Sequence, residues 1–168
     1  SYGIGSAFMY YYPERVEVNG RNLVVDTQLN NEGYTSGRVL SDEGMTFKYG
    51  YLEVRAKLPS ASGFWGKMLL SNENYKGTTV SQIDVFNTSK EPNKIFASTG
   101  VLGSIDYFET HRGLADPSYD CYRSYTLPEG QYFNEDEYHT YGVEWTAEYI
   151  RFFIDGQSYG MVEITDSK

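Results

Sequence analysis

The sequence predicts an all-β protein in which two antiparallel sheets stack as a sandwich, in the manner of a jelly roll. Aromatic residues make up 17% of the 168 residues, with 17 Tyr beside 17 Gly, a composition that suits strands and tight turns. Gly, Asn and Pro recur about every ten residues and separate short strand-like segments. These segments are too many for one flat sheet, and 40% of the residues are apolar, enough to fill a core between two sheets. We therefore expect a single domain over residues 1–168.

The first predicted element is a β-hairpin formed by residues 15–18 and 22–27. Asn19-Gly20 lies between these two segments and accepts the positive φ angles of a type I′ turn. The next element, residues 50–58, alternates between apolar and polar side chains. Leu52, Val54, Ala56 and Leu58 share one face, and Tyr51, Glu53, Arg55 and Lys57 share the other. We expect the first face to pack on the core and the second to meet water.

Eight further segments are predicted as strands: residues 35–41, 64–71, 80–87, 94–101, 124–127, 138–145, 149–155 and 159–164. Residues 155–157 form a second tight hairpin turn, and Asn134 is placed to cap a short helical turn over residues 134–137. Residues 105–123 show little periodicity and contain Gly113 and Asp116-Pro117. We expect this stretch to form a long surface loop of the kind that borders a binding site.

Charge and composition exclude several classes of function. Fourteen Lys and Arg against 23 Asp and Glu give a formal charge of -9, the wrong sign for a nucleic acid partner. No apolar run is long enough to span a bilayer, and the first residues lack a signal-peptide pattern, so any targeting signal is absent or already removed. A single cysteine, Cys121, excludes an internal disulfide, and two histidines leave little material for a metal centre. We therefore expect no cofactor and no membrane association.

Five motifs occur together in the order typical of one enzyme family. They are YTSGRV (34–39), YGYLEVRAKLPSASGFW (49–65), QIDVFN (82–87), YHTYGVEW (138–145) and IRFFIDG (150–156). Over residues 11–156 the chain resembles the laminarinase-type enzymes of glycoside hydrolase family 16. This resemblance implies a concanavalin A-like jelly roll, a secreted or extracellular location, and a polysaccharide of the β-glucan class as partner.

The resemblance also implies where the active site lies. In the family, one strand resembles E-I-D-I-x-E: the first Glu is the nucleophile, the Asp supports it, and the last Glu is the general acid and base. Gln82, Asp84 and Asn87 hold those three places with the same spacing. Alternation puts the first two on one sheet face, and a β-bulge is needed to bring Asn87 to join them. Because an amide is a poor nucleophile and a poor proton donor, we expect binding of the polysaccharide without efficient hydrolysis.

Three further residues are expected to contact the polysaccharide. Trp65 is the last residue of the motif at 49–65, and we expect its ring to stack on a sugar ring. Arg38 and Tyr34 are the next candidates for contact with the polysaccharide. Each has an alternative explanation: the Trp as a core residue, the Arg in a surface ion pair, and the Tyr as a filler of the sheet. His139 matches a scaffold motif and is expected to be structural. Family members often carry a structural Ca²⁺, but this sequence does not support one.

Two other functions stay open. The first is an active endo-β-1,3(4)-glucanase that uses a rearranged pair of carboxylates, with Asp84 as nucleophile or with Asp106 or Glu109 brought in from the loop. The second is a structural extracellular β-sandwich that self-assembles. Deliberate substitution of an enzyme would also explain the two amides.

The C-terminal strand motifs of the family are missing from this sequence. The family usually ends with strands resembling L-N-L-A-V-G-G and D-Y-V-R-V-Y, and neither follows residue 156. We expect a C-terminally incomplete domain whose sheets another chain or segment completes.

Asn87-Thr88-Ser89 matches the N-glycosylation acceptor pattern, and a glycan there would block the polysaccharide.

Overall fold

Nearly all the regular structure of the chain is β-strand, as the composition predicts. The computed structural model describes residues 9–31, 33–41, 45–60, 64–71, 79–88, 90–103, 122–134 and 136–164. Among these residues there are thirteen strands and one short 3-10 helix, and no helix long and apolar enough to cross a membrane. The chain divides into two units, Ser1–Phe47 and Lys48–Lys168, each with its own sheets.

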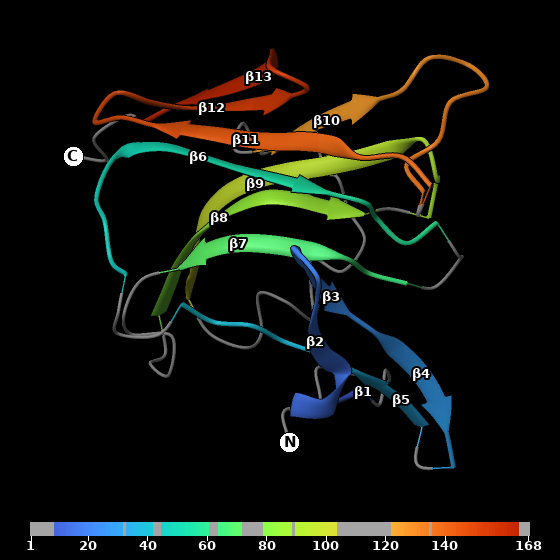
Figure 1. Cartoon of the computed structure of the whole chain (residues 1–168). Helices are drawn as coiled ribbons and strands as arrows, with labels where there is room; N and C mark the ends of the chain where they lie inside the picture. Colours follow the sequence, from blue (N-terminus) through green and yellow to red (C-terminus); the bar gives the residue numbers. More distant parts are fainter. Residues whose placement is uncertain are drawn as a thin grey trace. The chain divides into compact units, whose positions relative to one another are not determined.

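The unit Ser1–Phe47 contains a three-stranded sheet and a separate hairpin (Figure 1). The sheet has the order β1-β5-β4, with β1 at Met9–Tyr11, β4 at Thr27–Asn30 and β5 at Gly33–Ser36. The 3-10 helix η1 (Pro13–Arg15) leads into the hairpin of β2 (Val16–Asn19) and β3 (Asn22–Val25). The predicted hairpin is confirmed, but its turn is formed by Gly20 and Arg21, because Asn19 pairs with Asn22 at the end of the ladder. Of the two, only Gly20 has a positive φ, 64°, so the predicted type I′ turn at Asn19-Gly20 is wrong. The parallel pairing of β1 with β5 is the exception to the predicted antiparallel sheets.

Two predicted strands of this unit differ in extent from the structure. The segment predicted over residues 22–27 breaks at Asp26, whose backbone N–H donates to the Arg15 carbonyl at 2.8 Å and whose carboxylate lies 3.5 Å from the Arg15 guanidinium. The chain then enters β4, which the sequence did not predict. The strand predicted over residues 35–41 ends at Ser36. At Gly37 a Cβ would lie 2.7 Å from the Arg15 carbonyl oxygen, so this close approach requires glycine.

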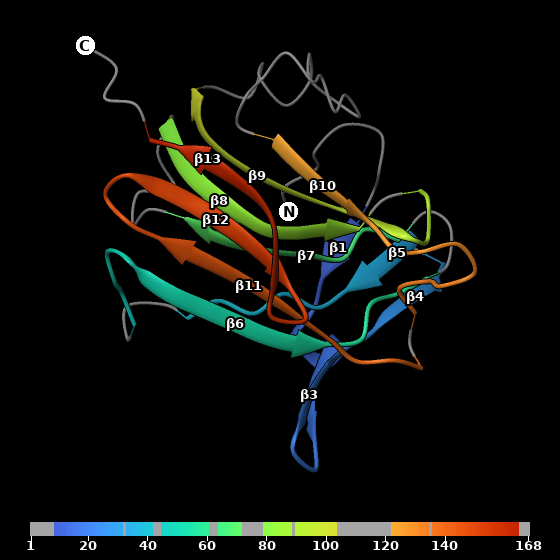
Figure 2. The ribbon, with the colours of Figure 1, turned by 90° about the horizontal axis from the view of Figure 1, so that it is seen from above.

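The unit Lys48–Lys168 is the predicted two-sheet sandwich. One sheet has the order β10-β9-β8-β7 and the other the order β13-β12-β11-β6, and every pairing within them is antiparallel. The strands are β6 (Gly50–Ala56), β7 (Lys67–Ser71), β8 (Thr79–Thr88), β9 (Lys94–Gly103), β10 (Tyr122–Thr126), β11 (His139–Trp145), β12 (Tyr149–Ile154) and β13 (Gln157–Glu163). Figure 1 shows the two sheets as separate layers, and Figure 2 shows their strands running in similar directions.

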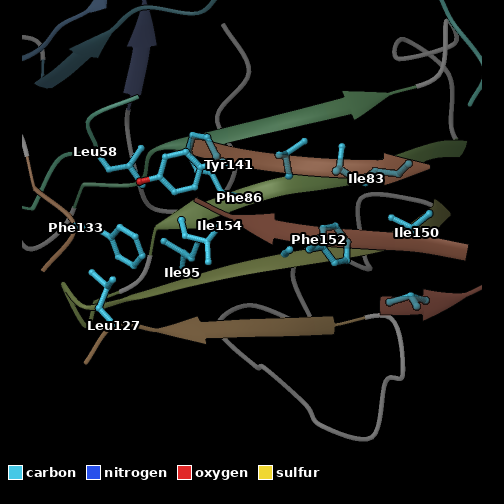
Figure 3. Close-up of a cluster of buried hydrophobic side chains, with 14 residues drawn as sticks. Leu58, Ile83, Phe86, Ile95, Leu127, Phe133, Tyr141, Ile150, Phe152 and Ile154 are labelled. Carbon is cyan, nitrogen blue, oxygen red and sulfur yellow. The ribbon is translucent and has the colours of Figure 1, made fainter. Parts of the chain in front are cut away.

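The core of this unit lies between the two sheets (Figure 3). Val85 of β8 and Ile95 of β9 come from one sheet, and Tyr141 of β11 and Phe152 of β12 come from the other, each no more than 2% exposed. Burial of these side chains is the main force that holds the layers together, at roughly 1.5–3 kcal/mol for each large apolar group. The sheet β10-β9-β8-β7 therefore has an inner, apolar face and an outer face that is free to carry polar residues.

Most predicted elements of this unit are confirmed, with shifts at their ends. In β6, Leu52, Val54 and Ala56 are half-buried and the odd positions between residues 51 and 55 are exposed, as the alternation predicts. The turn at Asp155 and Gly156 has φ angles of 48° and 74°. Asn134 Oδ1 accepts the backbone N–H groups of Asp136 and Glu137 at 2.9 and 3.0 Å, but among the described residues no helix follows this cap. The last two residues of the predicted loop 105–123 belong to β10, and the rest of that loop lies outside the described residues.

Candidate functional site

A bulge in β8 brings three polar side chains to the outer face of its sheet. Against β7, residue 84 pairs with residue 69 and residue 86 with residue 68, so Val85 is an extra residue in β8. Against β9, the pairing passes from Asp84 directly to Asn87. Val85 and Phe86 both turn into the core, at 2% and 6% exposure, and Asn87 returns to the face that carries Gln82 and Asp84. The predicted bulge is therefore present at the predicted place.

Asp84 is the central acceptor of this cluster. Its Oδ1 accepts a hydrogen bond from Gln82 Nε2 at 2.9 Å and lies 3.0 Å from Lys67 Nζ. Its Oδ2 accepts hydrogen bonds from Asn87 Nδ2 at 2.9 Å and from Ser98 Oγ at 3.0 Å. A carboxylate offers about four acceptor positions, so these four donors use its full capacity. Asp84 is 5% exposed and is held in one orientation from three neighbouring strands.

The charge of Asp84 is balanced within the cluster. A buried carboxylate without a partner is strongly destabilising, and a paired, fully hydrogen-bonded one is tolerated. Lys67 supplies the opposite charge from β7, with 21% of its side chain exposed against 7% for that of Asp84. One negative and one positive charge leave the site neutral, and the two amides add hydrogen-bonding groups without adding charge.

Trp65 stands beside this cluster with its ring exposed to solvent. Its Nε1–H donates to Asn87 Oδ1 at 3.1 Å, and 63% of the residue is accessible. Gly66 donates its N–H to Thr88 Oγ1 and accepts the Thr88 N–H at its carbonyl, both at 2.9 Å, so the backbone next to the Trp is fixed to β8. The core interpretation of Trp65 is wrong, because the ring is not packed among apolar side chains of the sandwich. An exposed, oriented indole beside amides is an arrangement suited to a sugar ring.

Asn87 has both of its polar atoms engaged, one by Asp84 and one by Trp65. It lies inside β8, and the Thr88 hydroxyl of the acceptor triplet is bonded to Gly66. A glycan on Asn87 would have to displace these contacts, which argues against modification of the folded protein.

Two of the remaining predicted residues, Tyr34 and Arg38, belong to the other unit of the chain. Tyr34 lies in β5 of the unit Ser1–Phe47, 50% exposed, and Arg38 follows that strand on the same unit. Their place in the site stays a prediction. Asp106, Glu109 and the second histidine, His111, lie outside the described residues.

His139 sits in the other sheet, at the start of β11, and is 8% exposed. Its Nδ1 lies 2.7 Å from Asp155 Oδ2, and its ring packs edge-on against Phe133. Burial by itself raises the pKa of Asp155, but the hydrogen bonds from His139 and Thr140 outweigh it and hold that pKa below its ordinary value. These are the surroundings of a structural histidine, as predicted.

Two residues of the cluster, Lys67 and Ser98, were not predicted. The one available signal was a lone charged residue at the start of the otherwise apolar run that follows Trp65. Only the register of β7 and β9 against β8 shows that both side chains reach Asp84. Across the described part of the chain, no three His, Cys, Asp or Glu side chains gather closely enough to hold a metal ion.

Comparison with known proteins supports the same family as the motifs. Residues 7–168 match the family model of glycosyl hydrolases family 16. Glucan endo-1,3-beta-glucosidase A1 of Niallia circulans is 28% identical over 130 residues, which cover 75% of this chain and 17% of that protein. Beta-1,3-glucan-binding protein 1 of Galleria mellonella is 26% identical over 133 residues, 76% of this chain and 25% of its own length.

A solved structure confirms the predicted jelly roll. The laminarinase catalytic domain of Thermotoga maritima MSB8 matches with a TM-score of 0.72 at 26% identity, over 92% of this chain and 62% of that domain's chain. The chain therefore spans less than two thirds of each of these three proteins.

Proposed function

Because this chain belongs to glycosyl hydrolases family 16, we propose that its unit Lys48–Lys168 binds a polysaccharide of the β-glucan class without hydrolysing it efficiently. The observation that carries the proposal is the pair of hydrogen bonds by which Gln82 and Asn87 both donate to Asp84. These are the residues that the family motif places at the nucleophile and at the acid and base. One relative is named as a glucan-binding protein and another as a glucosidase, so both outcomes occur among relatives of this chain.

The chemistry of the cluster argues against hydrolysis. A retaining glycosidase needs two carboxyl groups about 5–5.5 Å apart, one to attack the anomeric carbon and one to protonate the leaving oxygen. The amides of Gln82 and Asn87 do neither, and the loss of acid–base help alone typically costs a factor of about 10² to 10⁴ in rate. Asp84 is a poor replacement nucleophile, because its two oxygens already accept four donors.

The same cluster retains groups that bind a neutral sugar. Each amide uses one N–H for Asp84 and keeps a second, and among the described residues Gln82 Oε1 has no partner within the protein. Hydroxyl groups of a sugar can donate to this oxygen and accept from these N–H groups. The exposed Trp65 ring adds an apolar face next to them. Because the cluster is neutral overall, no net charge loses its hydration when a sugar covers it.

The direct test separates binding from cleavage. Purified protein is run by affinity electrophoresis in laminarin, lichenan and agarose, and each polysaccharide is incubated with it and assayed for new reducing ends. We expect retardation by at least one β-glucan and no increase in reducing ends. Gln82→Ala and Asn87→Ala should weaken the retardation, while Tyr51→Ala, on the outer face of the other sheet, should leave it unchanged.

Two other results would replace this proposal. Cleavage that survives Gln82→Ala and Asn87→Ala but is lost in Asp84→Ala would establish the rearranged active enzyme. Absence of both retardation and cleavage would favour the structural sandwich. We also propose an extracellular location, because a high-molecular-mass polysaccharide would be met outside the cell.

A further inference from the structure

We infer that Lys67 is a positioning residue of this site, whose ammonium group fixes Asp84 and through it both amides, and which would slow hydrolysis near neutral pH if the two carboxylates were restored. The inference deepens the proposed function and rests on it for the identity of the sugar, but not for the contact itself.

The geometry places the Lys67 side chain on the same face as the cluster. In the ladder of β7 and β8, Lys67 lies directly opposite Asn87, so both side chains stand on the outer face of the sheet. Its Nζ reaches past the amide to Asp84 Oδ1 at 3.0 Å, the oxygen that also accepts from Gln82. Within the described parts of the chain, this is the one cation paired with Asp84.

The ion pair determines what the amides do. With Asp84 oriented, each of its oxygens accepts from one amide N–H. The second N–H of each amide and Gln82 Oε1 are left for a ligand, while Asn87 Oδ1 accepts from Trp65. Without Lys67, the buried carboxylate would lack a counter-charge and would move towards water. The amide hydrogen bonds to it would then be strained or lost, and the amides would no longer be held in one orientation.

The same ion pair opposes a return to catalysis. In a Gln82→Glu/Asn87→Glu variant, the carboxylate at position 82 would attack the anomeric carbon while the bond from that carbon to the leaving oxygen breaks. The carboxylic acid at position 87 would give its proton to that oxygen, and would then take a proton from the water that releases the sugar. The Asp84 carboxylate, 2.9 Å from the Asn87 amide, favours the protonated acid at position 87, and the Lys67 ammonium on the same carboxylate opposes this effect. The pKa of a Glu at position 87 is therefore lower with Lys67 than without it, and less of the acid is available near neutral pH.

The first experiment measures hydrolysis of laminarin by Gln82→Glu/Asn87→Glu with and without Lys67→Ala, between about pH 4 and pH 8. We expect the triple variant to release reducing ends at least about tenfold faster near pH 7, with the alkaline limb of its pH–rate profile at higher pH. Coincident profiles, or no hydrolysis by either variant at any pH, would overturn the inference.

The second experiment needs no polysaccharide. Urea unfolding is compared for the wild type, Lys67→Met, Asp84→Asn and the double variant, with Lys67→Arg as the charge-conserving control. We expect Lys67→Met to lower the urea midpoint in the wild-type background and to change it little beside Asp84→Asn, because the carboxylate that needs the cation is then gone. Lys67→Arg should stay close to the wild type.

Equal shifts in the two backgrounds would show that Lys67 acts only through packing and would overturn the inference. If Lys67→Met fails to fold, we expect the double variant with Asp84→Asn to fold. Failure of both variants to fold would overturn the inference. If the wild type binds no glucan, the proposed function fails, while this second comparison still decides the role of Lys67.

Discussion

Removal of the Trp65 ring gives the sharpest test of sugar binding at this site. At the upper end of the area that an aromatic side chain can bury, about 250 Å², the exposed fraction of 63% leaves about 160 Å² accessible. A sugar ring stacked on one face would cover about half of this, or about 80 Å². At about 25 cal/mol per Å², the contact contributes about 2 kcal/mol, so Trp65→Ala should weaken the glucan affinity about 30-fold.

Titration calorimetry with laminarin oligosaccharides measures this change, and affinity electrophoresis checks it on the polymer. Trp65→Phe keeps an aromatic face but loses the Nε1–H bond to Asn87, so it should retain much of the affinity. Tyr51→Ala removes an aromatic residue that is 53% exposed on the other sheet and should have no effect. Wild-type affinity in a folded Trp65→Ala protein, for every glucan that the wild type binds, would refute the stacking argument.

Three further predictions concern stability, each measured by urea unfolding. Gly142→Ala should destabilise the protein by about 0.5–1.5 kcal/mol, because a Cβ would lie 2.6 Å from Tyr51 Oη and displace that ring from its contact with Phe153. Beside Tyr51→Ser the same change should be neutral or stabilising, and equal effects in both backgrounds would contradict the clash. Phe152→Ala should cost roughly 3–5 kcal/mol, because this ring is 0% exposed in the core, and a loss below about 1 kcal/mol would contradict that packing. Asp155→Asn should reduce the loss of unfolding free energy at acid pH. The pKa of Asp155 is lower in the folded than in the unfolded protein, where it is about 3.9, so the ionised carboxylate stabilises the fold above that pH. This stabilisation is lost as the pH falls through the folded pKa. The effect should be small, since 52% of the Asp155 side chain is exposed. An identical dependence of unfolding free energy on pH in the wild type and in Asp155→Asn would contradict this contribution.

Local pattern was sufficient for most strands of the unit Lys48–Lys168. The alternation of residues 50–58 and the tight turn at Asp155 and Gly156 depend on neighbours in the sequence, and both are found in the structure. The N-terminal region was predicted less well. There the break at Asp26 and the end of β5 depend on contacts with Arg15, which lies more than ten residues away in the chain. A parallel pair such as β1 and β5 likewise has no local signature.

In the candidate site, too, some features were determined by local sequence and others by contacts between distant strands. The motif QIDVFN by itself determined which residue types stand at positions 82, 84 and 87, and therefore that amides stand at two positions where the resemblance to the family implies carboxylates. Strand alternation predicted that a bulge was needed, because the spacing from 84 to 87 is odd. The tertiary structure alone decided what surrounds Asp84, because Lys67 and Ser98 come from two other strands and only the register of those strands sets their distances. A sequence determines the chemistry that each residue can offer, and the pairing of distant strands decides which of those groups meet.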